Sequence, residues 1–482
     1  MEKSEVELKI DYQKIKLKSG IEIHQQLDTH KLFCECPSLL RQDEPDFKIS
    51  RKLHAVAGES GEIDEAAKHE AGQEKTFLYE GYNDTTCLVE LDESPPEQIN
   101  QEALEIALQI ALLLNCEILP VTQIMRKTVI DGSNTSGFQR TLIIARNGYV
   151  ETKHGKVRID NVSLEEDAAR IIIQEKGKNV FRLDRLGIPL VEVGTAPDIK
   201  TPEQAKETAL HIGDILRSCK VKRGIGTIRQ DVNLSIYGGK RVEIKGVQEP
   251  ALISKTIIKE IERQKKTKLE RGEVRKANPD GTTIFLRPLP GAARMYPETD
   301  LPLLKISREM INHAKKTLPK LKTEVREELR EKGLSEEMIK LVLSENKIEE
   351  FKALLKLYNQ PNFIVKALLL YPKEISSHEK IKNIDKKLTV DIIESIIENV
   401  AKKKISEQQV KQVMKEIVKG KKLEEALKIE KPETENLEQE IINLLKQKPG
   451  LSQGAYMGLL MQKHKGKISG KEIAEILKKH IK

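Results

Sequence analysis

Carboxylates interrupt several segments of the sequence that are otherwise apolar. Glu22 and His24 share the polar side of an alternating segment, and Glu192 breaks an apolar run that is typical of a buried strand. Three acids also follow one another at residues 165–167, between apolar neighbours. Burying a carboxylate without a partner is strongly unfavourable, so each of these acids requires a metal ion or a basic side chain nearby.

Two more acids, Asp231 and Glu243, lie on the polar side of a predicted β-hairpin. Together with His24, these carboxylates form a mainly oxygen-donating set, which suits Mg²⁺ or Mn²⁺ better than structural zinc. Such ions commonly serve phosphoryl transfer, where they bridge the phosphates of a nucleotide. The alternative is that each acid faces water or pairs with a basic neighbour such as Arg229 or Lys245, and the pattern alone favours that alternative.

The cysteines offer a second candidate metal site. Cys34, Cys36 and the distant Cys87 are possible zinc ligands by type, but a single Cys-x-Cys pair is a weak signal. A fourth ligand would have to come from one of three other residues, His30, Cys116 or Cys219. We therefore expect reduced, partly buried cysteines rather than zinc. The sequence contains no Walker A motif, dinucleotide fingerprint, nucleophile elbow or His-Glu-x-x-His motif.

The elements that must position the acids are strands and helices in the first 300 or so residues. Alternation from Ile15 to Leu27 predicts a strand. A capping box that begins at Ser94 predicts a helix from about Pro95 to Asn115, and Thr201 begins a second helix that ends near Cys219. The hairpin with the polar side is predicted to have a three-residue loop, Gly238–Lys240, which pairs Ile236 with Val242.

The rest of the chain is predicted to be helical. From Glu309 onward Lys, Glu, Leu and Ile recur with helical spacing, Pro432–Glu435 is predicted to be a linker, and a last module follows from Leu437. The chain is therefore expected to be an α+β protein with a mixed first domain at residues 1–303, a helical domain at 304–431 and a small helical tail at 437–482. A length of 482 residues agrees with two to four domains.

The composition of the chain indicates where the protein is located more clearly than what it does. A net charge of +8 is modest for this length and decides little about nucleic acids, and the absence of Trp beside abundant Lys and Glu points weakly to a heat-tolerant source. Five cysteines do not form a secreted disulfide framework. The N-terminus has no apolar targeting region and no apolar run approaches the length of a membrane span, so we expect a cytoplasmic protein with no membrane partner.

Four stretches taken together are specific to one family; they are Gly20–Leu27, Met125–Thr141, Leu183–Ile199 and Ala293–Asp300. They resemble the GatB/GatE family of tRNA-dependent amidotransferases, and the sequence of Pro290–Asp300 is closer to its archaeal branch, GatE. The resemblance covers about Lys16 to Pro302 strongly and the helical region loosely. It returns in the tail at Tyr456–Met461.

This resemblance implies a cradle-shaped first domain and a tail similar to free-standing YqeY proteins. It implies that Mg²⁺ (or Mn²⁺) and ATP activate the glutamate of Glu-tRNA(Gln) as a γ-phosphoryl ester. Ammonia from an asparaginase-like partner amidase, of the GatD type, would then displace the phosphate to give Gln-tRNA(Gln). The family also implies a heterotetramer. The alternatives are a GatB-type enzyme that amidates Asp-tRNA(Asn) too, and a tRNA-binding scaffold without catalysis.

Carried over position by position, the family's catalytic metal ligands fall on His24, Glu166 and Glu192. Its second metal position falls on Glu22, Asp231 and Glu243. Contacts to the nucleotide or to the tRNA 3′ end are expected from the residues of the second and fourth stretches, namely Arg126, Lys127, Ser133, Arg140 and Tyr296, with Tyr296 as a stacking platform. A core or surface role for each of these five is equally expected.

One feature departs from the family. The GatE branch usually carries an inserted domain similar to one of bacterial aspartyl-tRNA synthetases, whereas here Arg263 is followed closely by Glu273. Without that domain, the basic tail is expected to contribute more of the tRNA contact through phosphate charge, with lysines at positions 463, 465, 467 and 471. How tRNA(Gln) is told from tRNA(Glu) is then left open.

Overall fold

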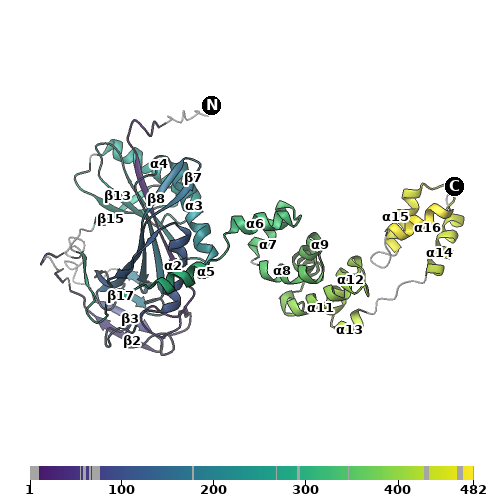
Figure 1. The fold of residues 1–482 in the computed structure, drawn as a ribbon, viewed down its shortest axis with the longest axis horizontal. Helices are drawn as coiled ribbons and strands as arrows, with labels where there is room; N and C mark the ends of the chain where they lie inside the picture. Colours follow the sequence, from purple (N-terminus) through teal and green to yellow (C-terminus); the bar gives the residue numbers. More distant parts are fainter. Residues whose placement is uncertain are drawn as a thin grey trace. The chain divides into compact units, whose positions relative to one another are not determined.

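The computed structural model describes residues 10–54, 56–57, 61–63, 67, 76–175, 178–267, 269–289, 294–345, 347–381, 383–427, 434–463 and 470–480. The chain divides into two compact units, residues 1–321 and 322–482 (Figure 1). The predicted first domain ends at residue 303, before helix α5 (Arg308–Lys316). That helix packs against α2 (Gln101–Leu113) and therefore belongs to the first unit.

An eleven-stranded mixed sheet dominates the first unit, in the order β15-β14-β13-β12-β1-β11-β8-β7-β6-β16, with β4 also paired to β7. Its strands are β1 (Lys18–Gln26), β4 (Glu117–Ile118), β6 (Met125–Thr128), β7 (Phe138–Thr152), β8 (Gly155–Glu166), β11 (Pro189–Thr195), β12 (Ile228–Ser235), β13 (Val242–Lys245), β14 (Glu273–Ala277), β15 (Thr283–Pro288) and β16 (Met295–Pro297). Strand β1 lies near the middle, antiparallel to both of its neighbours, β11 and β12. The predicted strand at Ile15–Leu27 is thus confirmed, beginning three residues later and ending one residue earlier than predicted.

Two smaller sheets complete the first unit. One contains β2 (Phe47–Arg51), β3 (Phe77–Gly81), β10 (Lys178–Arg182) and β9 (Arg170–Glu175), in that order, and has its own small aromatic core. The other joins β5 (Val121–Thr122) to β17 (Leu304–Lys305). The expectation of a mixed α and β first part is confirmed.

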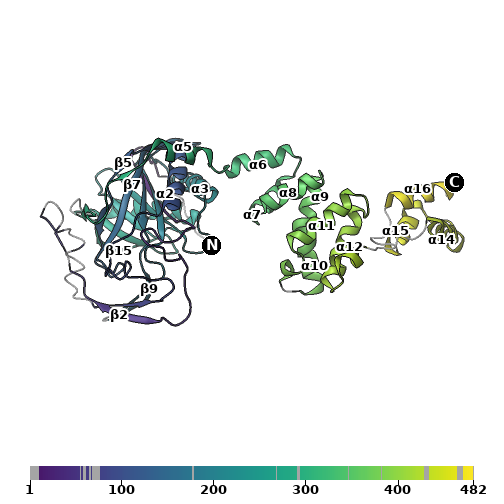
Figure 2. The same ribbon diagram turned by 60° about the horizontal axis from the view of Figure 1, so that its bottom comes forward.

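In the described part of the first unit, four helices share the apolar core with the large sheet: α2, α3 (Pro202–Ser218), α4 (Pro250–Lys266) and α5. Helices α2 and α3 lie side by side against the sheet in both views (Figures 1 and 2). Helix α3 begins as predicted, because the Thr201 hydroxyl accepts a hydrogen bond from the Gln204 amide.

The predicted start of α2 at Pro95 is wrong. The helix begins at Gln101, and the side chain of Asn100 caps it by accepting from the Ala103 amide at 3.0 Å. The preceding residues instead pair with the loop after β1, where the Glu97 amide donates to the Phe33 carbonyl. Tertiary hydrogen bonds thus replace the capping box that the local sequence offers.

The register of the β12–β13 hairpin also differs from its prediction. Val242 lies opposite Leu234, not opposite Ile236, and the connection spans residues 236–241. The shift is two residues, so every side chain keeps its predicted face. The polar face of the hairpin is confirmed, whereas its three-residue loop is wrong.

The second unit is helical throughout its described part, as predicted. One core is shared by α6 (Lys322–Glu331), α7 (Glu336–Ser344), α8 (Ile348–Leu357), α9 (Pro361–Val365), α10 (Tyr371–Glu379), α11 (Val390–Ala401), α12 (Glu407–Val418) and α13 (Leu423–Ala426). A separate core is shared by α14 (Thr434–Gln447), α15 (Gln453–Lys463) and α16 (Gly470–His480). Of the predicted linker, Pro432 and Glu433 lie outside the described residues, and Thr434 opens α14. Among the helices described, none has both the length and the apolar character to cross a bilayer.

Candidate active site

Strand β1 presents acid and imidazole groups on one face of the large sheet. Glu22 and His24 alternate with Ile21 and Ile23, which are buried in the core shared with the helices. The register with β11 places His24 opposite Glu192. The face of β1 that turns away from the core is therefore polar, and we call it the acid face, together with the matching residues of the neighbouring strands.

The first group of acids on this face combines three strands. His24, Glu165 and Glu192 each offer one atom able to bind a metal, and these atoms lie within 4.8 Å of one another. The His24 Nε2 atom is 3.2 Å from Glu192 Oε2. Lys127 Nζ donates to Glu165 at 2.5 Å and lies 3.9 Å from Glu192. The Thr141 hydroxyl also donates to Glu165, at 2.7 Å, so this carboxylate is held in place from two sides.

The second group of acids on this face includes two residues of the β12–β13 hairpin. Glu22, Asp231 and Glu243 bring their oxygens within 4.8 Å of one another. Lys245 Nζ lies between two of them, 3.0 Å from Asp231 and 2.6 Å from Glu243. The Asn233 amide donates to Glu22 at 2.9 Å.

The electrostatics of the acid face show a surplus of negative charge. Burial raises the pKa of Glu22 to about 7, and repulsion from Glu192 and Glu243 adds to the rise. Burial alone would lower the pKa of His24, but its hydrogen bond to Glu192 and the charge of that carboxylate raise it instead. In return, the pKa of Glu192 is lowered: burial opposes ionisation, and the hydrogen bond and charge of His24 outweigh it. Bound cations would relieve this repulsion.

The donor set fits Mg²⁺ or Mn²⁺. The two groups contain five carboxylates and one imidazole, whose donor atoms are hard and mainly oxygen. Their separations suit ions that hold ligands at about 2.1 Å after a small contraction. In the described part of the chain, Lys127, Lys245 and Arg241, whose guanidinium lies 3.7 Å from Glu22, compensate only part of the charge of the five carboxylates.

The structure brings Glu165, not Glu166, to His24 and Glu192. Glu166 turns to the opposite side of β8, where both of its oxygens lie 3.4–3.5 Å from Arg140 Nη1 and one accepts from the Arg140 amide. The physical reason is the alternation of side chains along a strand. Residues two positions apart on a strand share a face, and Leu164 is buried in the core. Glu166 therefore lies on the core side of β8, and Glu165 lies on the acid face.

Only one of the five expected nucleotide or tRNA contacts reaches the acid face, namely Lys127. Arg126 and Arg140 lie on the other face of β6 and β7 and both bind the carboxylate of Glu298, at 2.5 and 2.8 Å. Tyr296 packs edge-to-face on Phe138, with the ring centroids 6.3 Å apart. We call these residues, with Glu166, the arginine–glutamate cluster.

The fifth expected contact, Ser133, hydrogen-bonds the neighbouring Asp131 carboxylate at 2.6 Å. Its hydroxyl is thus used in a local turn. Neither Ser133 nor the arginine–glutamate cluster lines the cavity that contains Glu22 and Glu192.

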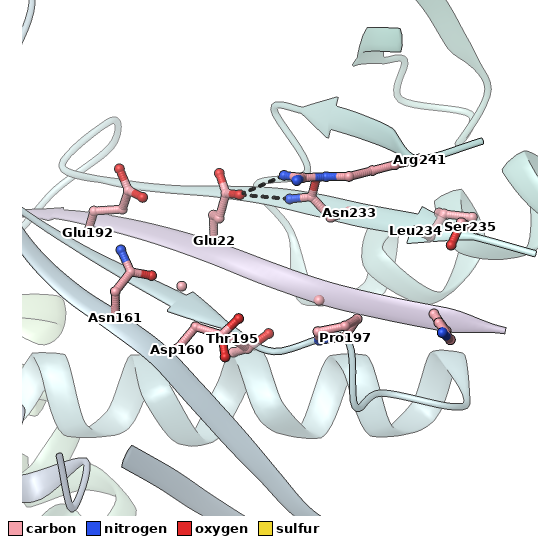
Figure 3. Close-up of a pocket in the computed structure, with 13 residues that line it drawn as sticks. Glu22, Asp160, Asn161, Glu192, Thr195, Pro197, Asn233, Leu234, Ser235 and Arg241 are labelled. Carbon is pink, nitrogen blue, oxygen red and sulfur yellow. Dashed lines mark hydrogen bonds and ion pairs between the residues drawn. The ribbon is translucent and has the colours of Figure 1, made fainter. Parts of the chain in front are cut away.

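A cavity of about 410 Å³ opens beside the acids, with Glu22 and Glu192 in its wall (Figure 3). Two glycines, Gly20 and Gly194, keep the space open. A Cβ atom on Gly194 would lie 2.5 Å from the Asn161 side-chain oxygen, and one on Gly20 would lie 3.0 Å from a backbone oxygen. The wall also contains basic, acidic and neutral polar groups, among them Lys18, Asp160, Asn161, Thr195, Ser235 and Arg241. None of these residues was assigned to a site from the sequence, because they gather only once the register of four strands is known.

A basic side chain borders the first acid group. Arg229 lies opposite His24 on β12 and is held by Asp167, with Nη2 to Oδ1 at 2.8 Å. Asp167 also accepts from Gln26 at 2.6 Å. Burial would raise the pKa of Asp167, but the charges of Arg229 and Arg185 hold it below its usual range. About 31% of the Arg229 side chain stays exposed.

Comparison with known proteins connects this chain to one family. A family model described as GatB/GatE catalytic domain matches residues 17–312. The chain is 37% identical to the E subunit of glutamyl-tRNA(Gln) amidotransferase from Methanocaldococcus jannaschii, over 98% of the chain and 100% of that protein. It is 35% identical to the protein of the same name from Archaeoglobus fulgidus (98% and 99% covered) and 31% identical to that from Pyrobaculum neutrophilum (96% and 98% covered).

The alignment with the Methanocaldococcus protein spans 631 positions, whereas this chain has 482 residues. At least 149 aligned positions therefore hold no residue of this chain. This difference agrees with the expected absence of an inserted domain. In the structure, only residues 267–272 separate α4 from β14.

Proposed function

Because this chain belongs to the GatB/GatE family of tRNA-dependent amidotransferases, we propose that it converts Glu-tRNA(Gln) to Gln-tRNA(Gln) with ATP and ammonia. The observation that supports this proposal is the acid face. Acids from β1, β8, β11, β12 and β13 gather beside a cavity and exceed the lysines that accompany them. Such an arrangement suits a nucleotide whose phosphates are bound through divalent cations.

The chemistry begins with a carboxylate, which is a poor acyl donor because oxide does not leave. In the proposed first step, an oxygen of the glutamate γ-carboxylate attacks the γ-phosphorus of ATP, and ADP leaves. In the second, neutral ammonia attacks the carbonyl carbon of the acyl phosphate, the carbon–oxygen bond breaks, and phosphate leaves with one ammonia proton. Both steps conserve atoms and charge.

The residues of the acid face have distinct parts in this proposal. His24, Glu165 and Glu192, and separately Glu22, Asp231 and Glu243, would hold Mg²⁺, which supplies charge neutralisation for the phosphates. Glu166, the expected third catalytic ligand, is replaced in this proposal by Glu165.

Basic side chains of the acid face add fixed positive charge. Lys127 and Lys245 lie among the carboxylates, and Arg229 presents its guanidinium at the edge of the first group. Groups that are fixed before the reaction stabilise developing charge without reorganising. We propose that Arg229 contacts the transferred phosphoryl group or the substrate carboxylate.

We place the nucleotide in the cavity, with its phosphates toward Glu22 and Glu192. Its volume falls in the usual range for small-molecule sites, about 300–1,000 Å³. Gly20 and Gly194 allow a ligand to approach the main chain closely. This placement replaces the expected contacts at Arg126, Ser133, Arg140 and Tyr296.

The test is ATP cleavage that depends on Glu-tRNA. With Mg²⁺, ATP, ammonium and Glu-tRNA(Gln), the chain should form ADP and Gln-tRNA. His24→Ala and Glu192→Gln should abolish both products while tRNA binding is retained. The matched control is Glu151→Gln, which alters an exposed acid on β7 and should leave the reaction unchanged. Normal ADP formation in the two site variants would refute the assignment.

The same assay separates the alternatives. Product from Asp-tRNA(Asn) would indicate a GatB-type enzyme with two substrates. Complete absence of ADP formation with tRNA binding intact would indicate a scaffold. We further propose an asparaginase-like amidase as the ammonia source, a heterotetramer in the cytoplasm, and a YqeY-like tail that binds tRNA phosphates. In that tail, Lys463 pairs with Glu440, Lys465 and Lys467 lie outside the described residues, and the side chain of Lys471 is not described.

A further inference from the structure

A basic segment lies at one end of the acid face. Residues 217–229, which run from the end of α3 into β12, include five basic residues and no acid. The last of them, Arg229, borders the first acid group. We propose that this segment, together with the exposed residues Leu39 and Leu40, binds the 3′ end of the tRNA and directs its aminoacyl group to the acid face. The inference rests on the proposed function and adds the side from which the tRNA approaches.

Within this segment, residues 222–227 form a loop with a fixed base, which we call the Ile225 loop. The buried side-chain amide of Gln25 donates to the carbonyl oxygens of Lys222 and Thr227, each at 3.1 Å. The Gln26 amide also donates to the Thr227 carbonyl oxygen, at 2.9 Å, and the Lys222 amide donates to the Gln26 carbonyl oxygen at 3.0 Å. The end of β1 thus holds both ends of the loop. A loop fixed in this way loses less conformational entropy when it binds a ligand.

The tip of the Ile225 loop is apolar. Ile225 is fully exposed and lies between Gly224 and Gly226, whose φ angles are +118° and +85°. Glycine adopts such angles without the strain that a side chain would cause. The loop can therefore turn tightly on either side of the isoleucine and present it to a ligand.

Two further apolar side chains are exposed next to this loop. Leu39 and Leu40 are 57% and 46% exposed. Their segment is joined to the Ile225 loop through Lys222, whose Nζ atom donates to the Ser38 carbonyl oxygen at 2.6 Å. Exposed apolar side chains that gather at one place on a surface commonly mark a contact site, whereas single ones do not.

Positive charge around the loop is only partly compensated. Burial lowers the pKa of Lys222, although Asp28 lies 3.8 Å from its ammonium group. Partial burial lowers the pKa of Arg223, and the charge of Arg217 adds to the fall. In the described part of the chain, Arg223 forms no ion pair with a carboxylate, and its guanidinium donates to the Arg217 carbonyl oxygen. Cations in this setting favour a bound anion such as a phosphodiester.

Arg229 connects the Ile225 loop to the acid face. Ile225 precedes it by four residues, which span at most about 14 Å. Asp167, which holds Arg229, accepts a hydrogen bond from Gln26, a residue that also holds the loop. Arg185 lies 3.8 Å from the same carboxylate. The basic surface is therefore continuous with the first acid group, and an aminoacyl end bound at the loop would extend toward Arg229.

The cavity lies toward the other end of β1. Lys18 and Gly20, which line it, precede Glu22 on that strand, whereas the Ile225 loop is held by the last residues of the strand. Figure 3 shows Glu22 and Glu192 at one end of the cavity and Ser235 at the other. The nucleotide and the tRNA would thus approach the acids from opposite sides. This arrangement suits phosphoryl transfer, in which the attacking and leaving oxygens lie roughly in line.

The chemistry of this surface favours RNA over a protein partner. A protein could also cover Ile225, Leu39 and Leu40, but five basic residues without an acid suit a polyanion better. The 3′ end of tRNA is single-stranded. Its unstacked bases can lie against apolar side chains while its phosphates face basic groups.

The experiment measures tRNA binding by the full chain in the absence of ATP. Uncharged tRNA(Gln) is compared with the same tRNA lacking its 3′-terminal CCA, and we expect the wild-type chain to bind the intact tRNA roughly tenfold more tightly. Arg223→Glu and Ile225→Asp should remove most of this difference and leave the affinity for the shortened tRNA unchanged. The matched controls Lys153→Glu and Leu303→Asp change exposed residues elsewhere in the first unit and should keep the difference.

A second measurement uses the wild-type chain and does not require any variant to fold. A photoreactive adenosine at the 3′ end of the tRNA should cross-link to the tryptic peptide of residues 224–229 or to residues 38–41, as located by mass spectrometry. Cross-links confined to the cavity wall near Lys18 would overturn the proposal.

Two results with the variants would also overturn it. One is an equal loss of affinity for the intact and the shortened tRNA. The other is unchanged tRNA binding together with lost association with a partner amidase, which would assign the surface to a protein. Binding and cross-linking do not require ADP formation, so a failure of this proposal and a failure of the proposed function are distinguishable.

Discussion

The two faces of strands β6, β7 and β8 carry charged groups of similar type in opposite settings. On one face, Glu298 is fully buried and shared between Arg126 and Arg140, so acid and base are matched. On the other, carboxylates exceed lysines and lie beside a cavity. We infer that carboxylates paired with arginines inside the protein serve the stability of the fold. Carboxylates whose charge is only partly compensated indicate a binding site for a ligand.

Breaking the matched face should have the largest effect on stability. Glu298→Gln leaves the buried Arg140 with fewer partners, and we expect a loss of about 3–5 kcal/mol in the free energy of unfolding. Urea unfolding followed by circular dichroism measures it. Glu151→Gln removes an exposed ion pair with Lys156 and should cost less than about 1 kcal/mol. Equal losses in the two variants would contradict the comparison.

Neighbouring residues of β8 sharpen the comparison for catalysis. Glu165→Gln removes a carboxylate of the acid face and should lower kcat for Gln-tRNA formation by roughly 10²–10³-fold. Glu166→Gln changes the next residue, which faces Arg140, and should reduce stability with a much smaller effect on kcat. A larger loss of kcat in Glu166→Gln than in Glu165→Gln would indicate that Glu166 is the metal ligand.

Removing the carboxylate charge that holds Arg229 should have an intermediate effect. Asp167→Asn keeps the shape of the side chain but removes the charge that holds this guanidinium. We expect a loss of roughly tenfold in kcat/KM, about 1.4 kcal/mol, because the arginine is still present but less well oriented. Arg229→Lys is the companion variant. If Asp167→Asn lowers stability alone and leaves kcat and KM unchanged, the arginine does not act on the substrate.

The last prediction concerns the pH dependence of stability in the absence of divalent ions. Glu22 has a pKa of about 7 in the folded chain and an ordinary value near 4.5. Between these pH values the folded state binds more protons than the unfolded state, so the free energy of unfolding should fall as pH rises from about 4.5 to about 7. The slope from this group is at most about 1.4 kcal/mol per pH unit. Glu22→Gln or added Mg²⁺ should flatten it, and an unchanged slope in both cases would contradict the pKa.

Several features of the fold could be predicted because local chemistry determines them. Helix α3 follows from Thr201 and Pro202, and the polar face of the hairpin follows from alternation. The start of α2 could not be predicted, because hydrogen bonds from Glu97 and Asn100 to the loop after β1 replace the local cap. Loop length in the hairpin could not be predicted either, since a shift of two residues preserves both faces.

The candidate site could also be predicted only in part from the sequence. His24 and Glu192, and the second acid group, are brought together as the family resemblance implied. Alternation with the core residue Leu164 would have favoured Glu165 over Glu166. The cavity could not be predicted, because its lining residues come from strands that are distant in the sequence and meet only in the folded sheet.

The glycine floor of the cavity limits how its shape can change. At Gly20 and Gly194 there is no side chain to shorten, so mutation can make this floor shallower but not deeper. An inhibitor bulkier than the natural ligand could not be accommodated by trimming the protein there. Resistance to such a compound, or an engineered preference for an enlarged substrate analogue, would have to arise instead at the surrounding polar wall.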